Sequence, residues 1–194
     1  MIGRVTRSPI PSILLVLALT ALAPAAGAQS LQITSTAFAA DGAIPAAHTC
    51  DGGDRSPPLV FSGVPASAKS IALIVDDPDA PAPDAKTPQK PWVHWVLYNL
   101  PVDSTGLAEA VEPTDLPFQA QQGSNDWHRT GYRGPCPPDG RHRYVHKIYA
   151  LDTVLTGLAS PTKAELEAAM KGHIVAEAQL VGTYQRAVRG EASR

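Results

Sequence analysis

The chain has 194 residues, of which 16 are Lys or Arg and 18 are Asp or Glu, so its formal net charge is −2. Without residues 1–28, which carry Arg4 and Arg7 but no acid, the basic count falls to 14 and the formal charge becomes −4. This mildly acidic balance argues against nucleic acid and against a generally anionic membrane surface as the main partner. The remaining 166 residues, 29–194, are a comfortable size for one domain with a single hydrophobic core.

The first 28 residues have the pattern of a secretory signal peptide. Arg4 and Arg7 form a basic segment, 13–22 is apolar, and Ala26-Gly27-Ala28 is a small-x-small cleavage site ahead of Gln29. The apolar run is well short of the roughly 20 residues that a membrane span needs. We therefore expect a periplasmic or secreted protein with no integral membrane segment after cleavage; an uncleaved N-terminal anchor is the alternative.

The two cysteines, Cys50 and Cys136, predict a disulfide, because an exported chain meets an oxidising compartment. Such a bond would tie the loop around Cys136 to the N-terminal region; two free thiols are the alternative. Neither cysteine belongs to a CxxC motif or to a pair of histidines with ligand spacing, so zinc is not expected.

Six segments have the apolar patterns of β-strands: 31–36, 59–62, 69–75, 92–100, 144–152 and 174–184. Two of them, 69–75 and 92–100, are apolar on both faces and are expected in the centre of a sheet. Residues 102–141 show no clear periodicity, and a connection of that length usually carries function or shapes a site.

One helix is predicted at about 163–171. Thr162 and Glu165 fit a capping box, Leu166 and Met170 lie on an apolar stripe, and Gly172 ends the segment. Residues 186–194 are expected to be a frayed tail. Many strands with one late helix predict a mainly β fold, a β-sandwich in one domain with long loops.

The stretch 131–144, GYRGPCPPDGRHRY, is the richest in residues kept for backbone shape or chemistry. Its prolines lack the N–H that a helix or a central strand requires. Its glycines at 131, 134 and 140 leave backbone N–H groups uncovered by side chains. A loop of this kind that leads into a strand opening with His142 predicts a small polar pocket; a tight connection between strands is the alternative.

Five side chains stand out by their position in or near strands. Asp77 and Asp79 follow a buried strand, His94 lies inside the next one, and strand alternation puts His142 and Tyr144 on one face. The same alternation puts His94 on the face of Val96 and Tyr98. Taken singly, these histidines could be core residues and Asp-Pro-Asp a turn. Together, an acid, two imidazoles, a phenol and bare glycine N–H groups predict a pocket for a small anion, with Asp77 as the orienting group.

These motifs closely resemble the phosphatidylethanolamine-binding protein family, in its bacterial Raf-kinase-inhibitor-like branch. The resemblance rests on DPDAP (77–81), WVHW (92–95) and GYRGPCPP…HRY (131–144), and extends over about 31–184. The motifs at 49–52, 56–59 and 99–101 match that branch as well. It implies a β-sandwich with a large central sheet, few helices and a shallow pocket for phosphate-type anions.

The resemblance also implies the residues of that pocket. Its ligand-binding residues would be Asp77, His94, His142 and Tyr144, with a rim formed by Asp79, Gly134, Pro137 and Pro138. Members of the family have cis prolines near the acidic motif, for which Asp77-Pro78 and Ala80-Pro81 are the candidates. The chain ends soon after Tyr184, so the C-terminal helix that borders the pocket in eukaryotic members is expected to be absent. Regulation of cytosolic kinases is not expected of an exported protein.

We therefore expect a non-enzymatic binding protein, without a cofactor, for a small anion or a phospholipid headgroup. A hydrolase using the same pocket is the alternative, although no G-x-S-x-G elbow and no poised nucleophile are present. A metal site at the acidic run does not fit an EF-hand, because Ala82 stands where Gly belongs and Pro88 where Glu belongs. An interaction module that uses the 102–141 loop, with an unknown protein partner, stays open.

Overall fold

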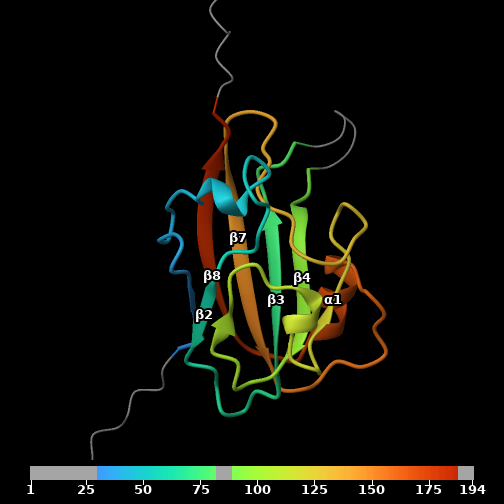
Figure 1. Cartoon of the computed structure of the whole chain (residues 1–194). Helices are drawn as coiled ribbons and strands as arrows, with labels where there is room; N and C mark the ends of the chain where they lie inside the picture. The colour runs from blue at the N-terminus through green and yellow to red at the C-terminus, as the bar shows by residue number, and fades with distance from the viewer. Residues whose placement is uncertain (1–29, 82–88, 188–194) are drawn as a thin grey trace, which may run out of the picture.

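A computed structural model describes residues 30–81 and 89–187. The expected signal peptide, 1–28, and residues 188–194 of the expected tail lie outside the described residues. The described chain forms two antiparallel sheets and one α-helix (Figure 1), so the prediction of a mainly β fold is confirmed. No helix within these two ranges is long and apolar enough to cross a bilayer.

The larger sheet has five strands in the order β6-β4-β3-β7-β8. Its strands are β3 (Ser70–Asp77), β4 (Trp92–Leu100), β6 (Gln121–Gln122), β7 (Arg141–Leu151) and β8 (Ile174–Gln185). All residues of β3 are buried, as expected of a central strand that is apolar on both faces. The smaller sheet has the order β1-β2-β5, formed by β1 (Gln32–Thr34), β2 (Leu59–Ser62) and β5 (Gly106–Leu107).

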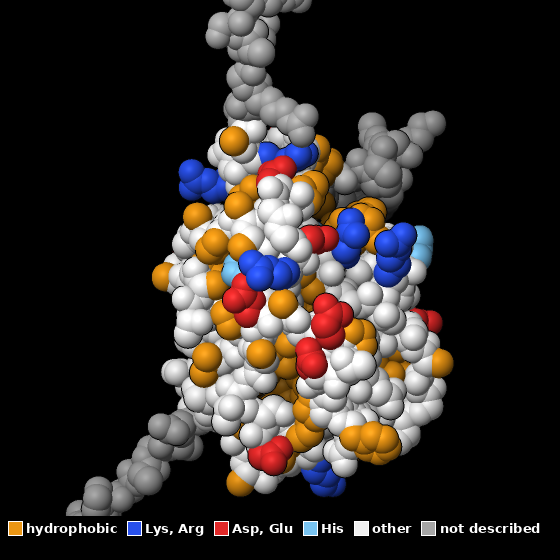
Figure 2. Space-filling model, in the orientation of Figure 1, with side chains coloured by type: hydrophobic (Ala, Val, Ile, Leu, Met, Phe, Trp, Pro, Cys, Tyr) orange, Lys and Arg blue, Asp and Glu red, His pale blue; other side chains and the backbone are white. Residues whose placement is uncertain are grey.

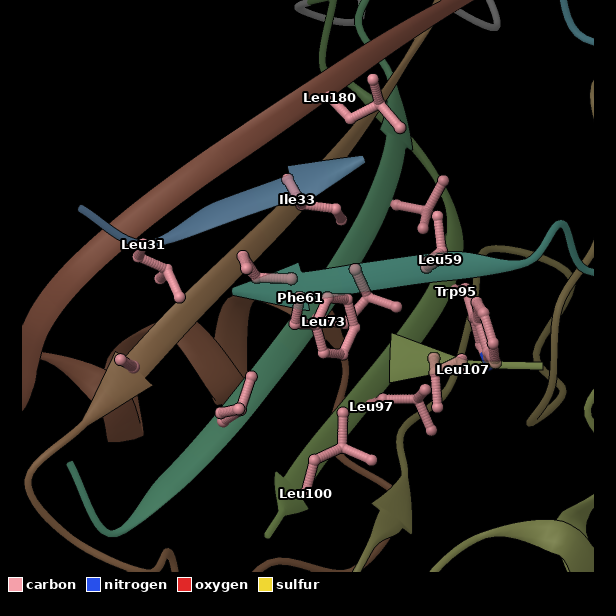
Figure 3. Packing of buried hydrophobic residues seen from close by; sticks show 14 of the residues in the cluster. Leu31, Ile33, Leu59, Phe61, Leu73, Trp95, Leu97, Leu100, Leu107 and Leu180 are labelled. Carbon is pink, nitrogen blue, oxygen red and sulfur yellow. The ribbon is translucent and has the colours of Figure 1, made fainter. Parts of the chain in front are cut away.

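The main hydrophobic core lies between the two sheets. Leu31 and Ile33 near β1 and Phe61 of β2 point toward Leu73 and Leu97 of the large sheet (Figure 3). A second cluster on the opposite face of the large sheet joins Ile74 and Val96 to the helix. The large sheet is therefore covered on one face by the small sheet and on the other by the helix.

The helix, α1, spans Lys163–Met170 and begins with the predicted capping box. The Thr162 hydroxyl accepts a hydrogen bond from the Glu165 N–H, and the Glu165 carboxylate accepts one from the Thr162 N–H. Leu166 and Met170 are the buried residues of the helix. The segment thus forms a helix because both the capping box at its N-terminus and the spacing of its apolar residues favour one.

The connection between β4 and β7 contains more structure than the sequence pattern showed. Besides β5 and β6, it forms a short 3-10 turn, η2 (Pro113–Asp115), while a second such turn, η1 (Ala46–His48), precedes Cys50. Strands of two residues are too short to leave a periodic signal, so the sequence pattern did not predict β5 and β6.

The expectation of cis prolines is wrong. No peptide bond among the described residues is cis, so both Asp77-Pro78 and Ala80-Pro81 are trans. The trans form of an X–Pro bond is favoured by about 0.5–1 kcal/mol unless the fold requires the cis form. The turn after β3 forms without a cis bond.

On the surface, acidic and basic side chains are interspersed over the face drawn in Figure 2, without a broad area of one sign. This arrangement fits the near-balanced composition.

Candidate functional site

A cavity of about 260 Å³ lies where the last residue of β3 meets the first residues of β4 and β7. These strand ends lie at the top of the large sheet in Figure 1. The lining residues are Asp77, Ala80, Pro81, Trp92, His94, Trp127, Cys136, Pro137, Pro138, His142 and Tyr144. The structure therefore brings together the acid, the two imidazoles and the phenol that the sequence singled out.

Asp77 and His142 form a buried pair at the base of this cavity. The His142 Nδ1–H donates to Asp77 Oδ2 over 2.7 Å, and the two side chains are only 8% and 5% exposed. The other carboxylate oxygen, Oδ1, accepts the Asp79 N–H at 2.8 Å. Because both oxygens are engaged, Asp77 fixes the orientation of the His142 ring. Nε2 of that ring has no hydrogen bond to any residue that the structure describes.

His94 faces the cavity because β4 has an extra residue at this point. Val75 pairs with Trp95 but Asp76 pairs with Val93, so His94 is the residue of a β-bulge. The prediction that His94 shares the face of Val96 and Tyr98 is therefore wrong. Its ring lies instead on the side of Tyr144, with ring centroids 5.2 Å apart.

Backbone contacts with Arg133 fix the tautomer of His94. The His94 Nδ1 lies 2.6 Å from the Arg133 carbonyl oxygen, and the Arg133 N–H donates to the His94 carbonyl oxygen at 3.1 Å. A carbonyl oxygen only accepts, so Nδ1 carries the hydrogen. Burial lowers the pKa of His94 below its ordinary value, although the Arg133 carbonyl and the charge of Asp77 oppose that shift. The neutral ring thus presents Nε2 as a hydrogen-bond acceptor.

The Tyr144 hydroxyl is buried beside Asp77 and the backbone of Cys136, and no group within residues 30–81 and 89–187 forms a hydrogen bond of good geometry with it. Burial, and then the charge of Asp77, raises the pKa of the Tyr144 phenol. The hydroxyl therefore keeps its hydrogen and is available as a donor at the cavity.

Two tryptophans form the aromatic wall of the cavity, and neither was singled out in the sequence. Trp127 packs edge-on against His94, with ring centroids 5.1 Å apart, and against Trp92 at 5.4 Å. The guanidinium of Arg133 lies 5.4 Å from the centre of the Trp127 ring. Trp92 belongs to the WVHW motif and could have been named; Trp127 lies in the loop without periodicity, where no local pattern marks it.

The expected rim residues divide into two groups. Pro137 and Pro138 line the cavity beside Cys136, whereas Asp79 and Gly134 do not. Asp79 binds the Arg143 guanidinium at 2.6 and 2.9 Å and accepts the Arg143 N–H, which holds the turn after β3 against the start of β7. These contacts lower the pKa of Asp79.

Gly134 is needed for close packing rather than for an exposed N–H. A Cβ on it would lie 2.4 Å from the His48 carbonyl oxygen, and its N–H donates to Asp54 at 2.6 Å. Gly131 and Gly140 are not among the lining residues either. The cavity is therefore built from side chains and not from glycine N–H groups.

The predicted disulfide between Cys50 and Cys136 is confirmed. It joins positions 86 residues apart, with a Cα–Cα distance of 5.4 Å, and no described cysteine is free. Cys136 itself lines the cavity, so the bond anchors the Cys-Pro-Pro wall to the loop that follows η1.

The acidic run does not form a metal cluster. Asp76 faces the opposite side of the sheet from Asp77 and forms ion pairs with Lys147 and Lys163. The other two acids pair with His142 and Arg143, so no two acids of the run share a partner. Among the described residues no group of three or more His, Cys, Asp or Glu could hold a metal ion.

Comparison with known proteins fits this geometry. The family model described as phosphatidylethanolamine-binding protein matches residues 34–185. The chain belongs to the phosphatidylethanolamine-binding protein family. A UPF0098 protein of Methanothermobacter thermautotrophicus is 50% identical over 157 residues, which cover 80% of this chain and 99% of the relative. A UPF0098 protein of Chlamydia trachomatis is 46% identical over 156 residues, with the same coverage.

Two crystal structures of family members resemble the fold of this chain. A homolog from Chlamydia trachomatis, described as a putative phosphatidylethanolamine-binding protein, has a TM-score of 0.75 and 45% identity, covering 81% of this chain and 99% of its own. E. coli YbcL, described as a new member of the mammalian PEBP family, has a TM-score of 0.74 and 32% identity, covering 82% and 100%. This chain is thus a binding protein of the phosphatidylethanolamine-binding family, in its UPF0098 group.

Proposed function

We propose that this member of the phosphatidylethanolamine-binding family is an exported, non-enzymatic receptor for a small anion of the phosphate or phospholipid-headgroup type. The observation that carries the proposal is the convergence of Asp77, His94, His142 and Tyr144 on one cavity. These four side chains come from three strands of the large sheet, which hold them in place independently of a ligand. A site on rigid elements is already organised for binding.

The chemistry of the cavity favours one anionic oxygen group beside apolar walls. The Tyr144 hydroxyl would donate to a ligand oxygen and His142 would contact the ligand through Nε2, while Asp77 orients His142 without touching the ligand. Trp92, Trp127 and the prolines give the cavity apolar walls, beside which charge-assisted hydrogen bonds are stronger than in bulk water. The volume, about 260 Å³, suits a headgroup or a small ion better than a whole lipid.

Export of the mature chain, residues 29–194 as one domain, is part of the proposal. It is supported by the basic, apolar and small-residue pattern of residues 1–28 and by the Cys50–Cys136 disulfide. N-terminal sequencing of the exported protein tests it. A mature start at Gln29 is expected, whereas a retained Met1 contradicts it.

A hydrolase is the second candidate, because an aspartate that holds His Nδ1 and leaves Nε2 free is the arrangement of a general base. Among the described residues that line the cavity there is no serine or threonine, and the one cysteine, Cys136, is in the disulfide. A water molecule activated by His142 would be the nucleophile in this candidate. Turnover of generic ester and phosphoester substrates by the wild-type protein, lost in His142→Ala, would favour this candidate.

Titration of the wild-type protein with inorganic phosphate and phosphoethanolamine tests the receptor function. NMR shifts at His94, His142 and Tyr144 are expected at millimolar ligand, and calorimetry gives the dissociation constant. Tyr144→Phe removes only the unpartnered hydroxyl, so it should keep the fold and weaken binding about tenfold, the worth of one buried hydrogen bond to a charged group. Absence of any shift at these three residues contradicts the proposal.

A further inference from the structure

Phe118 is a large apolar side chain that the fold leaves fully exposed. It lies in a turn between η2 and β6, which the Ala120 N–H closes by donating to the Pro117 carbonyl oxygen at 2.8 Å. Leu116 and Ala120, on either side of Phe118, pack against the main core. The turn is therefore anchored on both sides, and the fold itself presents the ring to the surface.

A cavity of about 530 Å³ adjoins this ring, at the opposite end of β4 from the candidate anion cavity. Phe118 itself lines it, together with Gln119, Gln121 and the loop 154–158. Within that loop, Val154 is 46% exposed. A projecting apolar ring and a hollow with an apolar edge thus lie side by side, and we call the two together the Phe118 patch.

Hydrogen bonds from the end of β4 hold both walls of this cavity. The Asn99 side chain donates to the Leu155 carbonyl oxygen at 2.8 Å and accepts the Leu155 N–H at 2.9 Å, which fixes the loop 154–158. The Tyr98 hydroxyl donates to the Gln121 side-chain oxygen at 2.5 Å, which fixes the other wall. The hollow is therefore formed before any partner binds, and binding has little ordering to do.

The charges favour a second copy of this chain as the partner. The chain has a formal net charge of −2, so most contacts between two copies bring like charges together. Among the described residues that line the cavity none is charged, and the nearest charges along the chain, Asp115 and Asp152, do not line it. Two copies can therefore meet at this patch without opposing charges, whereas a strongly charged partner would find no group to pair with.

The arrangement of ring and hollow also favours a second copy. A partner that fills this patch needs a hollow for the Phe118 ring and a projecting group for the cavity. The same patch on another copy supplies both, and a two-fold axis exchanges the two rings in one closed contact.

The area of the patch sets the strength of such a contact. An aromatic side chain buries about 150–250 Å², so two exchanged Phe118 rings and the surfaces that receive them would bury about 600–1,000 Å² in total. Stable interfaces bury about 1,200–2,000 Å², and weak or transient ones bury less. The patch by itself therefore supports a dimer that forms reversibly at high concentration.

We propose that the Phe118 patch is the interface of a transient, two-fold symmetric dimer, in which the Phe118 ring of each copy enters the cavity beside Val154 of the other. The contact leaves the candidate anion cavity open, because the two cavities lie at opposite ends of β4. The inference does not depend on the proposed anion-receptor function.

Sedimentation of the purified protein over about 10 μM to 1 mM tests the proposal, since a contact of this size should be only partly formed in that range. The wild-type protein should form a reversible dimer, and Phe118→Ser should raise the dissociation constant about tenfold or more, as loss of a central aromatic side chain does. Val60→Ser is the matched control, because Val60 is also exposed but does not line the cavity. Its dissociation constant should stay within about twofold of the wild-type value. Added sulfate should strengthen the dimer, whereas a contact held by charges would weaken.

A photo-crosslink tests the geometry. Benzoylphenylalanine in place of Phe118, in a mixture of unlabelled and isotope-labelled chains, should crosslink to residues 154–158 of the other copy. A monomer over the whole concentration range, a dimer that Phe118→Ser leaves unchanged, or crosslinks only to other segments would overturn the proposal. Monomeric wild-type protein that binds phosphatidylcholine vesicles, with binding lost in Phe118→Ser, would overturn it in favour of a lipid surface.

Discussion

Substitution of Asp77 by Asn is the most informative single change, because it removes one acceptor and changes little else. Asp77 accepts two hydrogen bonds, from His142 Nδ1–H at 2.7 Å and from the Asp79 N–H at 2.8 Å. An asparagine side chain has one oxygen and can accept only from one side. Its NH2 group must then face either the Asp79 N–H, which loses its acceptor, or His142 Nδ1, which must give up its hydrogen and change tautomer.

The magnitude follows from the burial of the pair. Both side chains are at least nine-tenths buried, so the bond from His142 is little screened, and hydrogen bonds to charged groups contribute about 1.5–3 kcal/mol. We expect Asp77→Asn to lower the free energy of unfolding by about 2 kcal/mol, measured by urea denaturation, or the midpoint temperature by about 4–8 °C. Phosphate affinity should fall about tenfold, because His142 loses its fixed orientation.

Asp79→Asn is the matched control, because it makes the same chemical change two residues away. Asp79 pairs with the exposed Arg143 and does not line the cavity. Its substitution should disturb stability less and leave phosphate affinity within about twofold. Equal effects of the two substitutions, or an Asp77→Asn protein with wild-type stability and affinity, would refute the role given to the buried pair.

Three further changes test the surroundings of the cavity. Burial lowers the pKa of His146 from 6.5 to about 4, so as the pH falls the unfolded chain binds this proton before the folded chain does. The free energy of unfolding should therefore decrease by about 3 kcal/mol between pH 6.5 and 4, and by much less in the His146→Leu variant. Because both ring nitrogens of His146 are buried without a partner in the described chain, His146→Leu should also stabilise by about 1–2 kcal/mol at pH 7 in urea titrations. Reduction of Cys50–Cys136, which closes a loop of 86 residues, should cost about 4 kcal/mol by denaturation with and without reductant. Gly134→Ala should destabilise by about 1–3 kcal/mol in the same assay, since its Cβ would lie 2.4 Å from the His48 carbonyl oxygen; a neutral effect would contradict the packing role.

The strands and the helix were predictable because their signals are local. The segments 59–62 and 92–100 form strands with the predicted bounds, and α1 begins after the predicted capping box. The segment expected to be a strand at 69–75 became Ser70–Asp77, with two acids inside a fully buried strand. The strand β7 and the helix α1 supply partners for those carboxylates, which an isolated stretch of sequence does not reveal.

The sequence by itself determined the longer strands, the helix, the disulfide and the polar residues of the cavity, since each follows from local pattern or from the scarcity of cysteine. Only the tertiary structure decided how those residues face one another. A bulge in the register between β3 and β4 turned His94 toward the cavity, and a carbonyl 39 residues away fixed its tautomer. Pairing between distant strands sets such contacts, and a change of one residue in register reverses the face of a side chain without altering the sequence pattern.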